Sequence, residues 1–218
     1  MSDEFKRLAA LAALDEIRDG MVVGLGSGST ASIFIRELGK KSSLKVLGIP
    51  TSEESRRIAI EVGIPLTNFE EHPDIDLTVD GADEVSPQLD LIKGLGGALV
   101  REKIVARASR RVVIIVDDRK MVERLGTKTV IPLEVIPLAV PRILALLKGS
   151  RVREKNGQPF ISDNSNVILD WNHGAIENPA ALEKELKMMT GIVDSGIFAG
   201  VATCVIVAGA TGIRKLGN

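Results

Sequence analysis

Aromatic residues and cysteines are scarce in this chain of 218 residues. It contains no tyrosine, one tryptophan, five phenylalanines and one cysteine. The lone Cys204 excludes a disulfide framework within the chain, and its place in the apolar run VATCVIVAG predicts a buried, inert thiol. Aromatic residues make up 3% of the chain and hydrophobic residues 44%, so a core must consist mostly of aliphatic side chains.

An excess of one charge and long hydrophobic runs are also missing. Lys and Arg number 28 and Asp and Glu 29, a formal net charge of -1. No basic field attracts nucleic acid or anionic lipid, and no apolar run reaches the roughly 20 residues of a membrane helix. Lys6 and Arg7 precede the apolar LAALAAL, but Asp15 and Glu16 follow at once, which favours an amphipathic helix over a signal peptide. We therefore expect a cytoplasmic protein without nucleic-acid or membrane partners.

Short apolar segments alternate with helical patterns in the first half of the chain. The expected strands are 21–25, 44–49, 75–79 and 111–116, and the expected helices are 3–19, 31–38, 98–109 and a segment that opens on the capping-box spacing of Thr51 and Glu54 and stops at Gly63. This alternation predicts right-handed βαβ units and an α/β fold, with a mostly parallel sheet covered by helices on both faces.

After Gly126 the pattern changes to that of a smaller α+β module with an antiparallel sheet. The expected helices there are 139–148 and 179–189, and the expected strands are 150–154, 158–162 and 166–171. The segment 202–209 has the apolar composition of a buried strand and can return to the first sheet. We therefore expect one domain made of residues 1–126 and 200–218 and a second made of residues 127–199.

The loop GSGST (26–30) follows the first expected strand and opens a helix. Glycines let a backbone approach an anion, and hydroxyls at a helix N-terminus suit phosphate. The sequence matches the dinucleotide fingerprint, but the acid expected about 20 residues later is missing, as is the lysine of a P-loop. A phosphate monoester fits this loop better than a dinucleotide. The alternative is an ordinary N-capped helix after a glycine turn.

The loops DGADE (80–84) and DDRK (117–120) also follow expected strands. Because ligands bind outside the carboxyl ends of parallel strands, these loops and GSGST can meet at one edge of the sheet. The acids of DGADE are open to three interpretations: a solvated turn, a metal site or acid/base chemistry. Carboxylates can hold Mg²⁺, but His72, His173 and Cys204 have no ligand partners at useful spacing, so acid/base chemistry is favoured over a metal.

Glu102 is the acid whose surroundings are most informative. In a helix from residue 98, its neighbours three and four positions away are all apolar: Ala98, Leu99, Val105 and Ala106. No salt bridge within the helix is available to it, whereas Lys103 and Arg107 can occupy the wet face. Desolvation raises the pKa of a carboxyl toward that of a general base working near neutrality. The alternative is a buried structural network of Arg101 and Glu102.

Lys93 opens the glycine-rich loop KGLGG (93–97). Flexible glycines would let its ammonium reach a substrate oxygen, although a lone lysine beside a loop is more often solvated surface.

Several motifs occur together in an order and at spacings that resemble a known family. They are GLGSGSTA, DGADEV, KGLGGALVREKIVA, DDRKMVERLG, SDNSNVILD and GIVDSGIFAG. The chain from about Lys6 to Ala208 resembles the A-type ribose-5-phosphate isomerases. Two departures are visible: Leu95 interrupts the four-glycine run usual in the family, and Ser27 stands where threonine is common.

The resemblance implies conversion of ribose 5-phosphate to ribulose 5-phosphate through an enediolate, without metal or organic cofactor. It implies a Rossmann-like domain, a smaller ferredoxin-like domain and a homodimer or homotetramer. It makes Glu102 the general base and Asp80, Asp83 and Lys93 the other catalytic residues. The implied substrate-binding residues are Ser27, Gly28, Ser29, Thr30, Asp80, Gly81, Ala82, Asp83, Lys93, Gly94, Leu95, Gly96 and Lys120, with Lys6 as a further phosphate contact.

Two other functions stay open from the sequence. One is a sugar-phosphate sensor that binds without catalysis, since a fold does not fix a function. No DNA-binding appendage or basic surface signal accompanies it. The other is an acyl-CoA transferase in which Glu102 is the nucleophile.

Overall fold

The computed structural model describes residues 2–217, which divide into two compact units. Unit 1 contains residues 2–82, 101–120 and 201–217, and unit 2 contains residues 83–100 and 121–200. The segment 83–100 thus belongs to the second unit, whereas the sequence suggested a continuous domain of residues 127–199. Each unit has its own hydrophobic core.

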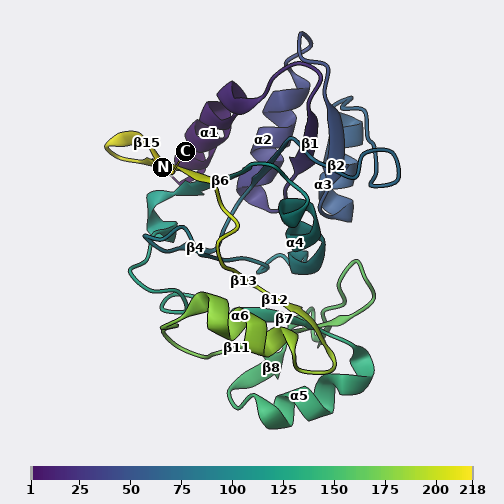
Figure 1. The fold of residues 1–218 in the computed structure, drawn as a ribbon, viewed down its shortest axis with the longest axis vertical. Helices are drawn as coiled ribbons and strands as arrows, with labels where there is room; N and C mark the ends of the chain where they lie inside the picture. Colours follow the sequence, from purple (N-terminus) through teal and green to yellow (C-terminus); the bar gives the residue numbers. More distant parts are fainter. Residues whose placement is uncertain (1, 218) are drawn as a thin grey trace. The chain divides into compact units, whose positions relative to one another are not determined.

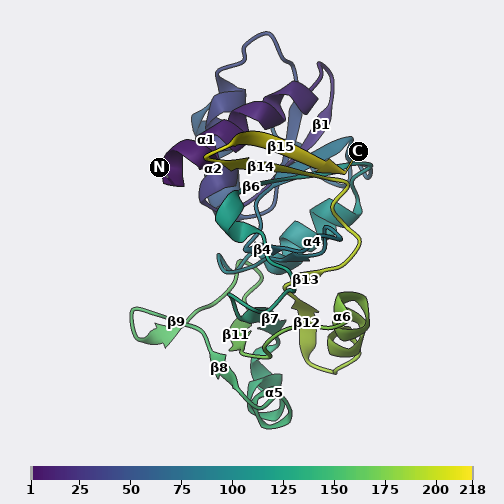
Figure 2. The same ribbon diagram turned by 90° about the vertical axis from the view of Figure 1, so that its left-hand side faces the viewer.

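Unit 1 is built on a six-stranded sheet of order β15-β14-β6-β3-β1-β2 (Figures 1 and 2). Its strands are β1 (Val22–Leu25), β2 (Leu47–Pro50), β3 (Leu77–Asp80), β6 (Val112–Asp117), β14 (Cys204–Gly209) and β15 (Gly212–Gly217). All neighbours pair in parallel except β14 and β15, which form an antiparallel edge hairpin. The predicted α/β fold and the return of segment 202–209 to this sheet are confirmed, while β15 was not predicted.

The helices of unit 1 differ from the prediction most at the end of the first helix and at the start of the third. They are α1 (Ser2–Ala13), α2 (Ser29–Gly39), α3 (Glu53–Glu61) and α4 (Leu99–Arg107), the last beginning in unit 2. The first helix ends before residue 19, because Ile17 turns to an extended conformation and lies in the core. The cap of α3 is formed by Ser52 and Ser55, not by Thr51 and Glu54, since the Thr51 hydroxyl donates to the Leu25 carbonyl instead.

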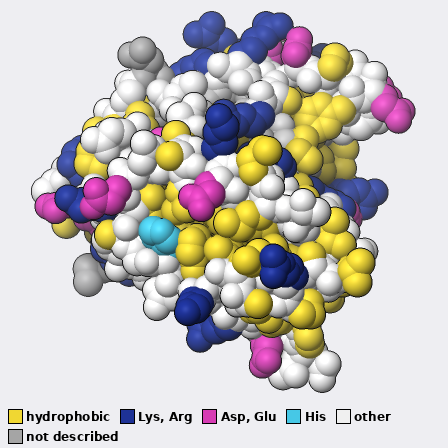
Figure 3. Space-filling model, turned by 60° about the horizontal axis from the view of Figure 1, so that its bottom comes forward, with side chains coloured by type: hydrophobic (Ala, Val, Ile, Leu, Met, Phe, Trp, Pro, Cys, Tyr) yellow, Lys and Arg dark blue, Asp and Glu magenta, His cyan; other side chains and the backbone are white. Residues whose placement is uncertain are grey.

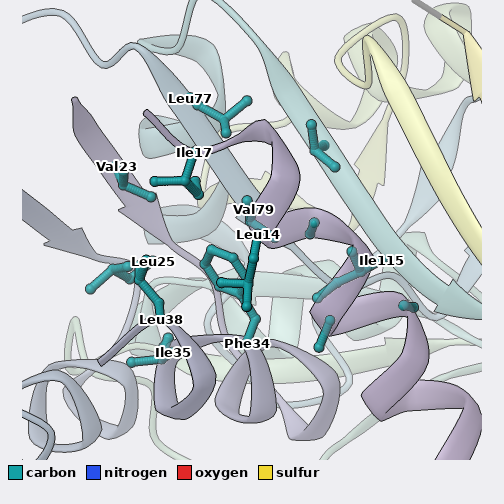
Figure 4. Close-up of a cluster of buried hydrophobic side chains, with 14 of the residues drawn as sticks. Leu14, Ile17, Val23, Leu25, Phe34, Ile35, Leu38, Leu77, Val79 and Ile115 are labelled. Atoms are coloured by element: carbon teal, nitrogen blue, oxygen red, sulfur yellow. The ribbon is translucent and has the colours of Figure 1, made fainter. Parts of the chain in front are cut away.

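The two faces of this sheet are covered by different helices. On one face, Phe34 and Ile35 of α2 pack against alternate strand residues such as Leu25 and Val79 (Figure 4). On the other face, Val105 of α4 packs with Val22, Ile49 and Ile75. Gly24 permits this close approach, because a Cβ there would lie 1.9 Å from Thr78 Oγ1 and 2.7 Å from Val105 Cγ1. The sequence thus brings α4, and Glu102 with it, tightly onto the sheet.

Unit 2 consists of short antiparallel sheets and two helices. One sheet has the order β13-β5-β4 and another the order β12-β7-β11-β8, with β9 and β10 as a separate hairpin. The strands are β4 (Glu84–Val85), β5 (Leu91–Ile92), β7 (Ile131–Val135), β8 (Ser150–Val152), β9 (Glu154–Lys155), β10 (Gln158–Pro159), β11 (Val167–Trp171), β12 (Ile192–Ser195) and β13 (Ile197–Phe198); the helices are α5 (Val140–Leu146) and α6 (Pro179–Lys187). The predicted antiparallel α+β module is confirmed in kind.

Unit 2 also exposes large apolar side chains. Leu138 is 91% exposed and Met188 77%, and Ile136 is half exposed. Figure 3 shows hydrophobic side chains gathered over the face that comes forward when the bottom of Figure 1 is turned toward the viewer. No helix within residues 2–217 is long and apolar enough to cross a membrane. Cys204 is buried in β14, and burial raises the pKa of its thiol, as expected of an inert cysteine.

Candidate active site

The loop between β1 and α2 is held by hydroxyl and carboxylate groups from neighbouring strands. The Ser27 hydroxyl lies 2.7 Å from Thr51 Oγ1 and donates to Ser52 Oγ at 2.8 Å. Thr51 and Ser52 directly follow β2, so the same sheet edge supplies them. From the sequence, Thr51 was expected only as a helix cap, although its position after a strand could have indicated this role.

Helix α2 begins immediately beyond this loop. Its N-cap is Gly28, at φ +87°, which provides no side-chain cap for the first N–H groups of the helix. Gly28 and Ser29 are exposed and Thr30 is half-buried. The alternative considered from the sequence, an ordinary N-capped helix, is therefore wrong, because no side chain caps α2. An exposed helix N-terminus lined with hydroxyls is suited to binding a phosphate group.

Asp80 is the last residue of β3 and is 2% exposed. Its Oδ1 accepts hydrogen bonds from the Ser27 N–H at 2.9 Å and the Gly81 N–H at 2.7 Å. Gly26 passes so close that a Cβ on it would lie 2.3 Å from Asp80 Oδ1 and 2.6 Å from Asp80 Cα. The solvated-turn interpretation is wrong for Asp80, because this carboxylate is buried and orients the neighbouring loop.

Glu102 lies in α4 and is 4% exposed, as its apolar helical neighbours predicted. Those neighbours, Ala98, Leu99, Val105 and Ala106, are all buried. The neighbouring Arg101 donates to Glu53 Oε1 at 2.9 Å.

The expected exposure of Lys103 is wrong: Lys103 is 7% exposed, whereas Ile104 is 52% exposed. Helical periodicity explains the difference. Lys103 lies four positions after Leu99 on the inward face, together with Glu102, and Ile104 turns outward. The inward face of α4 therefore carries two charged residues where the sequence suggested one.

The loop after β6 contains the segment DDRK. Asp117 is 2% exposed and accepts hydrogen bonds from Arg119 Nε at 2.8 Å and Nη2 at 3.0 Å. The hydrogen bond from the Arg119 guanidinium lowers the pKa of Asp117 below its ordinary value. Lys120 is half-buried at the end of a 3-10 turn, and Lys6 is paired with Asp3 at 3.4 Å near the start of α1.

In unit 2, Asp83 and Glu84 differ sharply although they are adjacent. Glu84 is fully buried, and its carboxylate accepts three backbone N–H groups, those of Gly126, Lys128 and Thr129, each at 2.6 Å. Such a carboxylate fixes the 126–129 turn and has a structural role. Asp83 is half-buried and accepts the Leu95 N–H at 3.0 Å, so it contacts the glycine loop instead.

Lys93 is 3% exposed, which rules out the solvated-surface interpretation. Its Nζ lies 5.6 Å from the centroid of the Phe198 ring, and its backbone N–H donates to the Gly196 carbonyl at 2.8 Å. Gly94, at φ +98°, turns the chain after Lys93, and the Gly97 N–H closes the turn onto the Gly94 carbonyl at 2.9 Å. An ammonium this buried is stabilised by a cation–π contact and is kept in place by its backbone.

Leu95 and Gly96 form the exposed tip of this loop. Leu95 is 42% exposed, and its backbone N–H is the group that donates to Asp83. Residue 95 is therefore partly exposed to solvent, while its backbone is held within unit 2.

The two units thus offer different chemical groups. Unit 1 supplies hydroxyls, a helix N-terminus and the buried carboxylates of Asp80 and Glu102, and unit 2 supplies the ammonium of Lys93 and the carboxylate of Asp83. Within residues 2–217, no three His, Cys, Asp or Glu side chains cluster so as to hold a metal ion. The groups present suit proton transfer and anion binding.

Comparison with known proteins gives consistent matches. The family model of ribose 5-phosphate isomerase A (phosphoriboisomerase A) matches residues 47–212. Ribose-5-phosphate isomerase A of Chloroflexus aurantiacus is 48% identical over 97% of this chain and 92% of its own. A structure of D-ribose-5-phosphate isomerase in complex with phospho-erythronic acid has a TM-score of 0.97 at 40% identity, covering 100% of both chains. Ribose 5-phosphate isomerase A from Methanocaldococcus jannaschii has a TM-score of 0.92 at 40% identity, covering 99% of each.

Proposed function

This chain belongs to the ribose 5-phosphate isomerase A family, and on that premise we propose that it interconverts D-ribose 5-phosphate and D-ribulose 5-phosphate with Glu102 as the general base. Aldose–ketose exchange moves a proton between adjacent carbons through an enediolate, so one base can shuttle it. The observation that carries this assignment is the burial of Glu102, 4% exposed on the inward face of α4 among aliphatic neighbours.

Three further residues complete the proposed chemistry. The ammonium of Lys93 stabilises the negative charge that develops on the enediolate oxygen, which is where a fixed positive group contributes most. Asp80 and Asp83 handle the hydroxyl protons of ring opening. Their environments differ, since Asp80 is buried and accepts two N–H groups at one oxygen, whereas Asp83 is half-buried. Two carboxyls in different environments can divide proton donation and acceptance.

The phosphate group is proposed to bind at the start of α2. The groups assigned to it are Ser27, Gly28, Ser29 and Thr30, with Lys120 and Lys6 as cationic contacts. Support comes from the helix N-terminus that no side chain caps and from the hydroxyls beside it. Gly81, Ala82, Gly94, Leu95 and Gly96 are proposed to contact the sugar. Phospho-erythronic acid carries a phosphate and a carboxylate, so we expect it to compete with the substrate.

The test of the base is the variant Glu102→Gln, which keeps the side-chain volume and removes the proton acceptor. General-base catalysis typically contributes a factor of about 10² to 10⁴, so we expect kcat to fall by that amount. Exchange of the C2 proton of ribose 5-phosphate with deuterated solvent should be lost together with turnover, while urea unfolding stays cooperative. The matched control is Glu123→Gln, a glutamate on the exposed surface, which should keep wild-type activity.

Near-wild-type turnover by Glu102→Gln would overturn the assignment of the base. Wild-type protein that binds the phosphosugar without isomerising it would instead indicate a sensor. A covalent adduct at Glu102 after incubation with an acyl-CoA would indicate a transferase. Isomerisation should persist after exhaustive EDTA treatment, since no metal is assigned a role.

The remaining proposals concern partners and organisation. We propose that the protein is cytoplasmic. We also propose that it forms a homodimer or homotetramer, because unit 2 exposes Leu138, Met188 and Ile136. Exposed apolar surface of this kind favours protein contacts, and sedimentation equilibrium measures the assembly. The domain bounds 1–126 with 200–218 and 127–199 also stay a proposal, which limited proteolysis can test.

A further inference from the structure

Arg153 lies between β8 and β9 of unit 2, and all three nitrogens of its guanidinium donate hydrogen bonds. Nε lies 3.1 Å from both carboxylate oxygens of Asp170, and Nη2 also donates to Asp170 Oδ1. Nη1 donates to two backbone carbonyls of the glycine loop, that of Gly94 at 2.9 Å and that of Leu95 at 2.8 Å. The side chains of Arg153 and Asp170 are each 11% exposed.

The backbone and ring contacts of Arg153 keep this guanidinium in one place. The backbone N–H of Arg153 donates to the Ile168 carbonyl, and the backbone carbonyl of Arg153 accepts from the Phe160 N–H, both at 2.8 Å. The guanidinium lies 6.0 Å from the centroid of the Phe160 ring. The same ring packs against Gly97, where a Cβ would lie 2.3 Å from Phe160 Cε1. Arg153 and Phe160 together thus contact the loop at both its ends.

The opposite side of the loop is held by Asp83. The Leu95 N–H donates to Asp83 Oδ2, while the carbonyls of Gly94 and Leu95 accept from Arg153. The peptide group between Gly94 and Leu95 is therefore held by a charged side chain at its N–H and by another at its carbonyl. Fixing the carbonyls of Gly94 and Leu95 fixes the rotation of the peptides that follow Lys93. The direction in which the loop presents its backbone is therefore set by charges outside it.

We propose that Arg153, oriented by Asp170, is a positioning residue that holds the loop 93–97 in the conformation needed for isomerisation. This inference rests on the proposed function, because the loop matters only if Lys93 and its neighbours contact the sugar. Arginine suits the task and lysine does not, since only a planar fork of five donors can engage a carboxylate and two carbonyls at once.

The test compares two arginines that are two residues apart. Arg153→Lys keeps the charge and loses the fork, and Arg151→Lys makes the same change at an exposed position in β8. A loop displaced by about 1 Å can cost up to about a hundredfold in rate, so we expect kcat of Arg153→Lys to fall by about ten- to a hundredfold. The KM for ribose 5-phosphate should change less than kcat, because the phosphate contacts are elsewhere in the sequence. Arg151→Lys should match the wild type.

Hydrogen–deuterium exchange supplies a readout that does not depend on catalysis. In Arg153→Lys the amides of residues 94–97 should exchange faster, while the core strands of unit 2 keep their protection. A structural role alone would lower protection throughout unit 2 and leave kcat per folded molecule unchanged, and that result would overturn the proposal.

Asp170 provides a second, independent check. Asp170→Asn should lower kcat in the same direction, and the double variant Arg153→Lys/Asp170→Asn should fall little further than Arg153→Lys, because both act through one contact. Fully additive losses would overturn the proposal. If the wild-type chain shows no isomerase activity, the proposed function fails; if the wild type is active and Arg153→Lys matches Arg151→Lys, this inference alone fails.

Discussion

Two loops carry most of the proposed substrate contacts, and they are supported in different ways. Loop 26–30 of unit 1 is held by Thr51, Ser52 and Asp80, each of which lies at or just after the end of a parallel strand. The parallel sheet alone delivers these anchors to one edge. Loop 93–97 of unit 2 is held by groups that no single sheet edge supplies.

The anchors of loop 93–97 come from three separate segments. Asp83 precedes β4, Arg153 follows β8, and Gly196 lies between β12 and β13. Each contact is specific to one side chain or one backbone group. Loop 93–97 therefore depends on three separately placed segments, whereas the anchors of loop 26–30 all lie at the ends of strands that neighbour β1.

Among changes that test the supports of these two loops, the largest effect is expected from Gly196→Ala. A Cβ at this position would lie 2.2 Å from the Lys93 carbonyl oxygen and 2.8 Å from Pro132 Cδ, and the Lys93 backbone cannot yield without moving its side chain. We expect a loss of about 1–3 kcal/mol in unfolding free energy from overpacking and a fall in kcat of about a hundredfold from displaced Lys93. Urea unfolding and steady-state kinetics measure the two effects.

The result for Gly196→Ala also tests the comparison of the two loops. Wild-type stability and kcat in this variant would show that the close packing of Gly196 against the Lys93 backbone, with the hydrogen bond from the Lys93 N–H to the Gly196 carbonyl, does not position the loop. A loss of stability with unchanged kcat would show that Gly196 supports unit 2 but not Lys93.

A smaller effect is expected from Thr51→Val in the other loop. Thr51 is fully buried, and its hydroxyl donates to the Leu25 carbonyl at 3.0 Å beside Ser27 Oγ. Losing one such hydrogen bond costs about 1 kcal/mol, and if Ser27 contacts the phosphate the KM should rise by about fivefold with kcat nearly unchanged. The control is Thr211→Val on the exposed surface. A change in kcat without a change in KM would place Ser27 away from the phosphate.

The fold of unit 1 was readable from the sequence because its strands are apolar and its helices periodic. Continuous apolar runs indicated β1, β3, β6 and β14, all of which are buried along their whole length, and helical spacing predicted the burial of Glu102. The strands β4, β5 and β13 have two residues each and give no periodic signal. Edge strand β15 is mostly exposed, so it gives no burial pattern either.

The candidate site was predicted in part for the same reason. Residues at strand ends, such as Asp80 and Ser27, follow from topology. Arg153 was not predicted, because it lies in the charged stretch RVREKNG, has no glycine motif beside it and meets its partner Asp170 only through the pairing of β8 with β11. Glu84 shares its acidic turn with Asp80, yet only its three backbone donors reveal a structural role.

The smallest predicted effect concerns the pH dependence of the parallel-sheet edge. Asp117 at the end of β6 is buried, and the exposed Arg119 guanidinium lowers its pKa by donating to it. A carboxyl with a lowered pKa in the folded state contributes stability above its unfolded pKa of about 3.9, and this contribution is lost as the pH falls through the lowered value. Arg119→Ala should therefore lower the urea midpoint slightly at pH 7.

That difference between Arg119→Ala and the wild type should shrink as the pH falls well below about 4, because Asp117 is then protonated in both proteins. Arg124→Ala is the matched control: its side chain is 62% exposed, like that of Arg119, but it pairs with Glu177, which is 85% exposed. Since exposed pairs contribute little, Arg124→Ala should leave the midpoint unchanged at any pH. An equal destabilisation of Arg119→Ala at neutral and acidic pH would mean that Arg119 acts by packing. The ion pair between Arg119 and Asp117 would then contribute nothing to the unfolding free energy.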